Sequence, residues 1–246
     1  MIDDLGRLSA PPAYQLVSQE LRKLILSGSL RPGDPFPSEI TLAERLGVNR
    51  STVREGIRQL EADGLVSREG RKRLHVSVPE AAQIAPRTTD ALILSAVTLG
   101  ELWEVCHVLE PLAARIAATR RTEAHLAELH ANNAQMASMV ENGRLTGETD
   151  LAFHGLVALA AGNSALLMAR EPVGRLLYPA FEQIEPQLPQ AGKRQLEAHI
   201  QVVVGIERGD AAHAEEWARK HIQDLRRGWD LAGLTLDTRV AARDLG

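Results

Sequence analysis

The fold of the N-terminal third is decided by residues 42–55, which read Leu42-Ala43-Glu44-Arg45-Leu46-Gly47-Val48-Asn49-Arg50-Ser51-Thr52-Val53-Arg54-Glu55. Two helices that cross at a tight turn need a small residue on the first helix, glycine in the turn and an apolar residue on the second helix. The stretch supplies these at Ala43, Gly47 and Val53. Ser38 is a suitable N-cap for a first helix that ends at Leu46. The pattern therefore predicts helix, turn and helix, with the second helix from about residue 50 to 63.

The sequence on either side completes a small domain. Upstream, apolar residues recur at helical spacing and Gly28 supplies a stop, which predicts a preceding helix. Downstream of Gly64, apolar and polar residues alternate, and the Gly-containing stretch 68–72 predicts the tip of a two-stranded wing. We therefore expect a winged helix-turn-helix over residues 1–78. The apolar positions are Val17, Leu21, Leu24 and Ile25 in the helix, and Leu74, Val76 and Val78 in the strand.

Three arginines follow one face of the second helix. Arg50, Arg54 and Arg58 are spaced by four residues, so they form one stripe beside the apolar stripe. An arginine that contacts guanine bidentately discriminates between bases by about 1–3 kcal/mol. On charge alone the stripe is equally consistent with a solvated helix face.

Charge is divided unevenly along the chain, whose formal net charge is -4. Residues 1–80 contain 12 basic and 11 acidic side chains, whereas residues 81–246 contain 16 and 21. Acidity thus belongs to the second part, as expected if only the first part contacts phosphates. Aromatic residues make up 3% of the chain, which argues against a single-strand binder that stacks bases.

Length and composition favour two domains and a cytoplasmic protein. The 246 residues are 44% hydrophobic and 24% charged, which suits ordinary globular cores. No signal peptide or membrane-spanning run is evident, so we expect no membrane partner. The single cysteine, Cys106, cannot form an internal disulfide.

The sequence after residue 78 predicts an all-helical C-terminal bundle, and hence a mainly α protein. Apolar periodicity lapses over residues 79–89, where Pro86 interrupts it, so we expect a linker there. Residues 90–232 have helical patterns and predict six or seven helices, followed by a tail at 233–246. Helix breaks are expected at Gly100, near Gly143 and Gly147, at Gly162-Asn163, across Pro186 to Pro189, and at Gly209-Asp210.

Four side chains in this domain have spacings that suit a metal site. Asp150 and His154 are four residues apart and share a helix face. His199 lies ten residues before Gly209, and His221 lies eleven after Asp210, so two antiparallel helices would place both imidazoles at one height. Three imidazoles and a carboxylate suit Zn first, with Ni, Fe or Mn as alternatives, and are too nitrogen-rich for Mg or Ca.

Open coordination positions on such an ion could bind the carboxylate or hydroxyl of a small acid. A metal-dependent enzyme and a sensor of the ion itself are the alternatives. No His-Glu-x-x-His, Gly-x-Ser-x-Gly or Gly-rich phosphate loop marks a general base or nucleophile, so we expect no enzyme.

Residues 13–78 resemble the winged-helix domain of the GntR family of repressors. The resemblance is carried by residues 30–39 and 42–55 and by Leu60-Glu61-Ala62-Asp63-Gly64-Leu65-Val66. It implies a DNA-binding homodimer that recognises double-stranded operator DNA. Ile40 and Asn49 depart from the usual family residues, which implies that one common DNA contact is lost and another is changed. The implied DNA-binding residues are Asn49, Arg50, Ser51, Thr52, Arg54, Gly70 and Arg71.

The rest of the chain looks like the FCD-type ligand-binding domain of the FadR subfamily. The resemblance is carried by residues 109–118, by Asp150-Leu151-Ala152-Phe153-His154 and by the two later histidines. In metal-containing members the positions of Asp150, His154, His199 and His221 are the metal ligands. The resemblance implies an effector, expected to be an organic or sugar acid. Cys106 stands where the family commonly has arginine, and we name Cys106 and His107 as candidate effector-binding residues.

Overall fold

The computed structural model describes residues 11–69, 73–144, 146–182, 187–188 and 190–240. The chain divides into two compact units, Met1–Ile84 and Ala85–Gly246. Within the described part of the chain, no helix is both long enough and apolar enough to cross a membrane.

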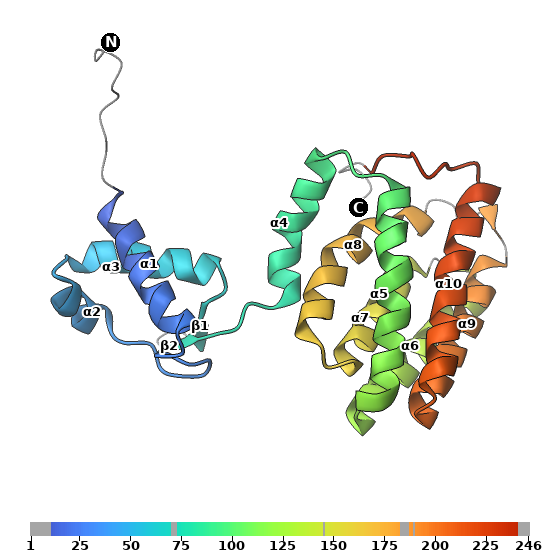
Figure 1. Cartoon of the computed structure of the whole chain (residues 1–246), viewed down its shortest axis with the longest axis horizontal. Helices are drawn as coiled ribbons and strands as arrows, with labels where there is room; N and C mark the ends of the chain where they lie inside the picture. Colours follow the sequence, from blue (N-terminus) through green and yellow to red (C-terminus); the bar gives the residue numbers. More distant parts are fainter. Residues whose placement is uncertain (1–10, 70–72, 145, 183–186, 189, 241–246) are drawn as a thin grey trace, which may run out of the picture. The chain divides into compact units, whose positions relative to one another are not determined.

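The N-terminal unit is a winged helix-turn-helix, as the sequence predicts (Figure 1). Its antiparallel two-stranded sheet pairs Val66 with Val76. One core joins the three helices and the sheet, and Val53, Ile57 and Leu60 of the third helix are fully buried in it. The elements are α1 (Ala13–Leu26), α2 (Glu39–Leu46), α3 (Arg50–Ala62), β1 (Val66–Glu69) and β2 (Arg73–Val76).

Local signals set the turn between α2 and α3. The backbone N–H of Thr41 donates to Ser38 Oγ at 3.1 Å, which caps α2. Gly47 ends α2 with φ of 66°, a left-handed conformation that glycine adopts without strain. One predicted apolar position is wrong as a core position: Leu24 is 43% exposed, because it lies at the edge of the apolar face of α1.

The C-terminal unit is an all-α bundle, which confirms the predicted fold class (Figure 1). The long helix α5 packs against α10, α8, α7 and α9. Two apolar clusters form its core, one rich in alanines of α5 and one around the fully buried Trp229. The helices are α4 (Ala81–Leu94), α5 (Leu99–Arg120), α6 (Glu123–Glu141), α7 (Gly147–Ala160), α8 (Ser164–Glu182), α9 (Ala191–Arg208) and α10 (Ala211–Leu231).

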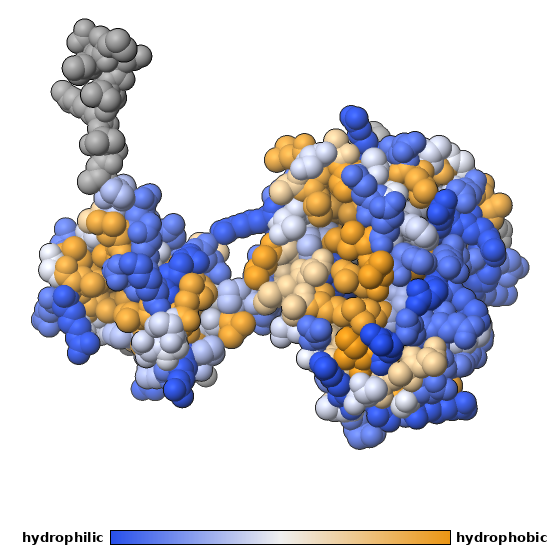
Figure 2. Space-filling model, in the orientation of Figure 1, coloured by the Kyte–Doolittle hydropathy of each residue, from blue (hydrophilic) through white to orange (hydrophobic). Residues whose placement is uncertain are grey.

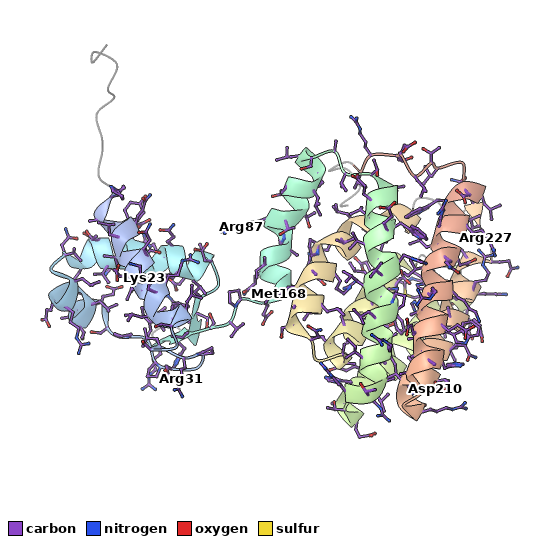
Figure 3. All side chains as sticks on the ribbon, in the orientation of Figure 1. Lys23, Arg31, Arg87, Met168, Asp210 and Arg227 are labelled. Carbon is purple, nitrogen blue, oxygen red and sulfur yellow. The ribbon has the colours of Figure 1, made fainter. Side chains whose placement is uncertain are left out.

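Helices α9 and α10 form a tight antiparallel hairpin. Gly209 ends α9 with φ of 71°, and the side chain of Asp210 caps α10 at the end labelled in Figure 3. A Cβ at Gly205 would lie 2.6 Å from the backbone nitrogen of Ala214. The two helices therefore approach closely only because position 205 lacks a side chain.

The predicted linker 79–89 is mostly helical, which corrects the sequence-based expectation. Helix α4 continues through Pro86, with Ala85 and Thr89 buried. A proline inside a helix removes one backbone hydrogen bond and crowds the carbonyl one turn before it, at a cost of about 3 kcal/mol. The alanine, glutamine and leucine residues around Pro86 are good helix formers and favour the helix. Apolar periodicity lapses because few of its residues face a core.

The segment after α10 is not a free tail over residues 234–240. The backbone N–H groups of Leu99 and Gly100 donate to the carbonyls of Thr238 and Leu236, at 2.9 and 2.8 Å. Val240 is buried against the same end of α5. The tail expectation fails because these contacts join segments more than a hundred residues apart, which no local pattern records.

Candidate functional site

Four buried side chains converge between α7, α9 and α10. One ligand atom from each of Asp150, His154, His199 and His221 lies within 4.8 Å of the others. Each of these side chains is at most 5% exposed. The structure thus brings together all four residues that the sequence predicts as metal ligands.

The separations within this cluster match those between ligands of one metal ion. His154 Nε2 and His221 Nε2 are 3.0 Å apart, and His199 Nε2 and His221 Nε2 are 3.4 Å apart. Asp150 Oδ1 lies 3.1 Å from His199 Nε2 and 3.5 Å from His221 Nε2. Nitrogen and oxygen ligands at about 2.0–2.1 Å from zinc in tetrahedral geometry are roughly 3.3 Å apart. The donor set and its spacing therefore fit a divalent ion.

The electrostatics of the cluster favour ligands in their metal-binding forms. Burial lowers the pKa of His199 to about 3, so this imidazole is neutral at pH 7 and keeps a lone pair. Burial alone would raise the pKa of Asp150, but His199 and His221 beside it hold the pKa well below its usual range. Although His199 Nε2 lies 3.1 Å away, Asp150 Oδ1 accepts no hydrogen bond of good geometry among the described residues, as expected of an oxygen that a cation would satisfy. The His199 ring is held in place by stacking on Phe153, with ring centres 3.6 Å apart.

Glu110 of α5 orients the imidazole of His154. Its Oε2 lies 2.9 Å from His154 Nδ1, so Nδ1–H donates to the carboxylate and the Nε2 lone pair faces the cluster. The other carboxylate oxygen accepts from Arg170 Nε of α8 at 2.9 Å. Burial raises the pKa of Glu110, but the charges of Arg170 and His154 outweigh it and hold the pKa at about 2.

Neither Glu110 nor Arg170 is predicted as a site residue from the sequence. A glutamate in the alanine-rich apolar face of α5 is a signal that could have marked Glu110. Arg170 and Tyr178 of α8 offer no such signal, because the site residues that they contact, Glu110 and His154, lie on other helices.

We expect Glu110→Gln to weaken zinc binding by about 10–100-fold, the usual effect of losing a carboxylate behind a metal-bound histidine. The change should also destabilise the protein, by up to about 3–5 kcal/mol, since buried Arg170 loses the fully buried one of its two carboxylate partners and keeps only Glu171. Competition with a zinc-chelating dye and urea unfolding measure the two effects. Glu104→Gln, on the exposed side of the same helix, is the control, and equal zinc affinities in both variants would contradict the role of Glu110.

The two candidate effector-binding residues face different surroundings. Cys106 is 1% exposed, and burial and then the charge of Glu110 raise the pKa of its thiol well above the usual range, so it is inert. His107 stacks on Trp103 with ring centres 4.6 Å apart, and burial and then Arg219 lower its pKa. Cys106 thus lies near Glu110 and Arg170, whereas His107 lies on the side of α5 that meets α10.

A pocket of about 430 Å³ opens between α9 and α10, and His221 forms part of its wall. Trp217 and Lys220 line the same pocket, as does Arg227, labelled on α10 in Figure 3. One of the four cluster residues therefore borders this pocket.

In the N-terminal unit, Asn49 begins α3 and organises its first turn. Asn49 Oδ1 accepts from the backbone N–H of Thr52 at 2.8 Å, which is an N-cap. The hydroxyls of Ser51 and Thr52 each donate to the same oxygen at 2.7 Å. These three residues, which the sequence names as DNA contacts, thus interact with one another, and two more, Gly70 and Arg71, lie outside the described residues.

Glu39 of α2 holds the two exposed arginines on the first turns of α3. Arg54 Nη2 and Nε donate to Glu39 Oε2 and Oε1 at 2.9 and 3.2 Å, and Arg50 Nη2 lies 3.8 Å from the same carboxylate. The side chains of Arg50 and Arg54 remain 60% and 50% exposed. This pairing lowers the pKa of Glu39, chiefly through its hydrogen bond with Arg54. Two guanidinium groups are therefore presented together on one helix face, as a major-groove reader requires.

Known proteins match both units. Residues 13–76 match the family described as bacterial regulatory proteins, gntR family, and residues 101–224 match the FCD domain. The HTH-type transcriptional regulator LutR of Bacillus subtilis is 30% identical over 206 residues, which cover 82% of this chain and 94% of that protein. The Glc operon transcriptional activator of Escherichia coli is 25% identical over 224 residues, and the alignment covers 88% of each chain.

A third relative and a solved structure agree with these family matches. The galactonate operon transcriptional repressor of Escherichia coli is 28% identical, over 80% of this chain and 88% of that protein. The structure of Streptococcus agalactiae GntR superposes with a TM-score of 0.63 at 25% identity, over 87% of this chain and 99% of that one. The chain therefore belongs to the GntR family of transcription regulators with an FCD domain, and is a DNA-binding regulator rather than an enzyme.

Proposed function

We propose that this regulator binds operator DNA through α3 and that a divalent metal ion, held by Asp150, His154, His199 and His221, forms part of its effector site. The observation that carries the proposal is the convergence of one carboxylate oxygen and three imidazole nitrogens at ligand-to-ligand distances. Zn²⁺ is the best fit, and Ni, Fe and Mn are the alternatives. His221 also borders the pocket between α9 and α10, and we propose that the ion exchanges with solvent on that side.

For the DNA contacts, we propose that Arg50 and Arg54 contact base edges or phosphates. We propose that Asn49, Ser51 and Thr52 fix the first turn of α3 and donate to phosphates, and that Gly70 and Arg71 of the wing contact the adjacent groove. The exposed guanidinium pair on Glu39 supports this assignment.

For the effector, we propose a small organic or sugar acid. Two relatives regulate the Glc and galactonate operons, and galactonate is itself a sugar acid. A bound divalent ion with open positions suits a carboxylate or hydroxyl ligand. Metal analysis of the native protein, followed by titration of a metal-loaded DNA complex with organic acids, tests the proposal. Release of DNA by the metal alone would favour an ion sensor.

We propose repression as the mode of control, with effector binding weakening the DNA complex. The named relatives include an activator as well as a repressor, so a promoter fusion decides this point. Deleting the regulator should raise expression from the promoter beside its gene. A fall in expression would show an activator.

We further propose a homodimer, in which two winged helices bind half-sites about one DNA turn apart. The exposed face of α5 carries Val105 and Val108, which are 41% and 63% exposed, and Figure 2 shows apolar surface along this helix. Leu94 of α4 is 87% exposed. An apolar face of this kind is typical of a subunit interface.

We expect Val108→Asp to weaken the dimer by at least about tenfold, because each copy would bury an unpaired carboxylate. Sedimentation equilibrium measures the change. Leu231→Asp is the matched control, since Leu231 is 65% exposed at the end of α10. A Val108→Asp variant as dimeric as the control would exclude this face as the interface, and a monomeric wild type would exclude the dimer.

A further inference from the structure

Two buried polar atoms beside the metal cluster have no hydrogen-bond partner. Arg170 and Tyr178 are each 1% exposed, and both Arg170 Nη2 and the Tyr178 hydroxyl are unpartnered among the described residues. Buried donors are almost always satisfied, and an unpaired one points to a water, an ion or a ligand. Both groups come from α8, two turns apart.

The guanidinium of Arg170 is fixed in orientation, which gives its third nitrogen a defined direction. Nε donates to Glu110 at 2.9 Å and Nη1 donates to Glu171 at 3.2 Å. A Cβ at Gly174 would lie only 2.5 Å from Nη2, so the glycine one turn along α8 leaves the space that Nη2 occupies. Two carboxylates thus hold the group while Nη2 stays available.

The ring of Tyr178 lies close to the same spot. Its ring stacks on the proposed metal ligand His154, with ring centres 4.6 Å apart. Its Cε2 atom would be 3.3 Å from a Cβ at Gly174, the same point that contacts Arg170 Nη2. Guanidinium, phenol and metal-binding imidazole therefore border one another.

The buried charges favour an anion there. Glu171 also accepts a hydrogen bond from the partly exposed Arg175 at 3.0 Å, so Arg175 balances the negative charge of Glu171. The remaining interior groups are Arg170, Glu110, Asp150 and, under the proposed function, a divalent cation. Together they carry one net positive charge, which a single carboxylate would neutralise.

We infer that Arg170 Nη2 and the Tyr178 hydroxyl form the subsite that binds the carboxylate of the small organic acid, next to the metal ion. This inference rests on the proposed function and identifies the residues that select an acid over an uncharged compound. Arg170 supplies a charge-assisted hydrogen bond and Tyr178 a neutral one. Gly174 is a positioning residue, because it leaves room for Arg170.

Calorimetric titration of the metal-loaded full-length protein with glycolate, L-lactate and D-galactonate tests the inference. For an acid that binds the wild type, we expect Tyr178→Phe to weaken affinity by about 3–10-fold and Arg170→Lys by about 10–100-fold. Gly174→Ala should also weaken it, by displacing Nη2. Tyr14→Phe is the matched control for Tyr178→Phe. Gly155→Ala is the matched control for Gly174→Ala, because a new Cβ at Gly155 would meet only Arg170 Nη1, at an ordinary contact distance of 3.9 Å.

Zinc content and DNA affinity of each variant separate the two proposals. If the wild-type protein did not bind zinc, the proposed metal site would be overturned. If the wild-type protein did not bind DNA, the DNA-contact assignment would be overturned. Unchanged acid affinity in Tyr178→Phe and Gly174→Ala, with zinc and DNA binding intact, would show that water satisfies these atoms and would overturn the subsite. Binding of none of the three acids by the zinc-loaded wild type would overturn it as well. Tyr178→Phe keeps the packing of the ring, so the test does not depend on Arg170→Lys folding correctly.

Discussion

Alanine in place of His199 is expected to abolish stoichiometric zinc binding while leaving DNA binding by the metal-free protein intact. His199 is fully buried and its Nε2 lies 3.1 Å from Asp150 Oδ1 and 3.4 Å from His221 Nε2. Loss of a residue behind a metal ligand weakens metal affinity by about 10–100-fold, so loss of a ligand itself should exceed about 100-fold. Equilibrium dialysis followed by metal analysis measures the change.

Thermal unfolding provides a second readout of the same substitution. Zinc at 1,000 times its dissociation constant stabilises the folded wild type by about 4 kcal/mol, which corresponds to roughly 8–16 °C for a domain of this size. In His199→Ala this zinc-dependent shift should disappear, and removing the ion from the wild type with a chelator should reverse the shift. His130→Ala is the control, because His130 is exposed on α6. A zinc-dependent shift of equal size in both variants would contradict the ligand assignment.

Alanine in place of Arg54 or Arg50 is expected to cause the largest loss of operator affinity. Each bidentate contact with a base is worth about 1–3 kcal/mol, and a dimer makes it twice, so the loss should be about 2–6 kcal/mol, or roughly 30-fold to 10⁴-fold. Fluorescence anisotropy with a duplex from the promoter beside the gene measures it. Zinc content should be unchanged, because these residues belong to the other unit.

Salt dependence distinguishes the two possible roles of each arginine. The plot of log K against log salt has a negative slope, and loss of a phosphate contact reduces the magnitude of this slope by about 0.9 per contact. Loss of a base contact leaves the slope unchanged and relaxes sequence specificity at one position. Lys23→Ala is the control, since Lys23 lies on α1 and pairs with Glu20 at 2.6 Å (Figure 3). Operator affinity equal to that of the control in both arginine variants would exclude α3 as the DNA-reading helix.

Elements with local signals were predictable. Ser38, Gly47 and Asn49 determine the turn and caps of the helix-turn-helix through bonds to residues at most a few positions away. Such bonds depend on residue type and spacing, which the sequence records directly. The sequence does not predict the break between α5 and α6, because the break contains neither glycine nor proline and its one local signal is the N-cap Thr122.

The metal cluster is only partly predictable from local signals. Asp150 and His154 are one helical turn apart, and His199 and His221 lie ten residues before and eleven residues after the Gly209-Asp210 turn, so spacing predicts each pair. Spacing does not predict that the two pairs meet, because α7 reaches α9 and α10 only through the packing of α5 and α6. The resemblance to a known family supplied that step.

By itself, then, the sequence determined the winged helix, the helical bundle and the identity of the four cluster residues, since caps, turns and apolar periodicity are local properties of the chain. Only the tertiary structure decided that Glu110 orients His154, that Arg170 and Tyr178 are buried beside it with unpaired donors, and that residues 234–240 pack on α5. These contacts join helices that are distant in sequence. Their energies come from burial and from paired charges in a shared interior, which exist only after the helices have packed.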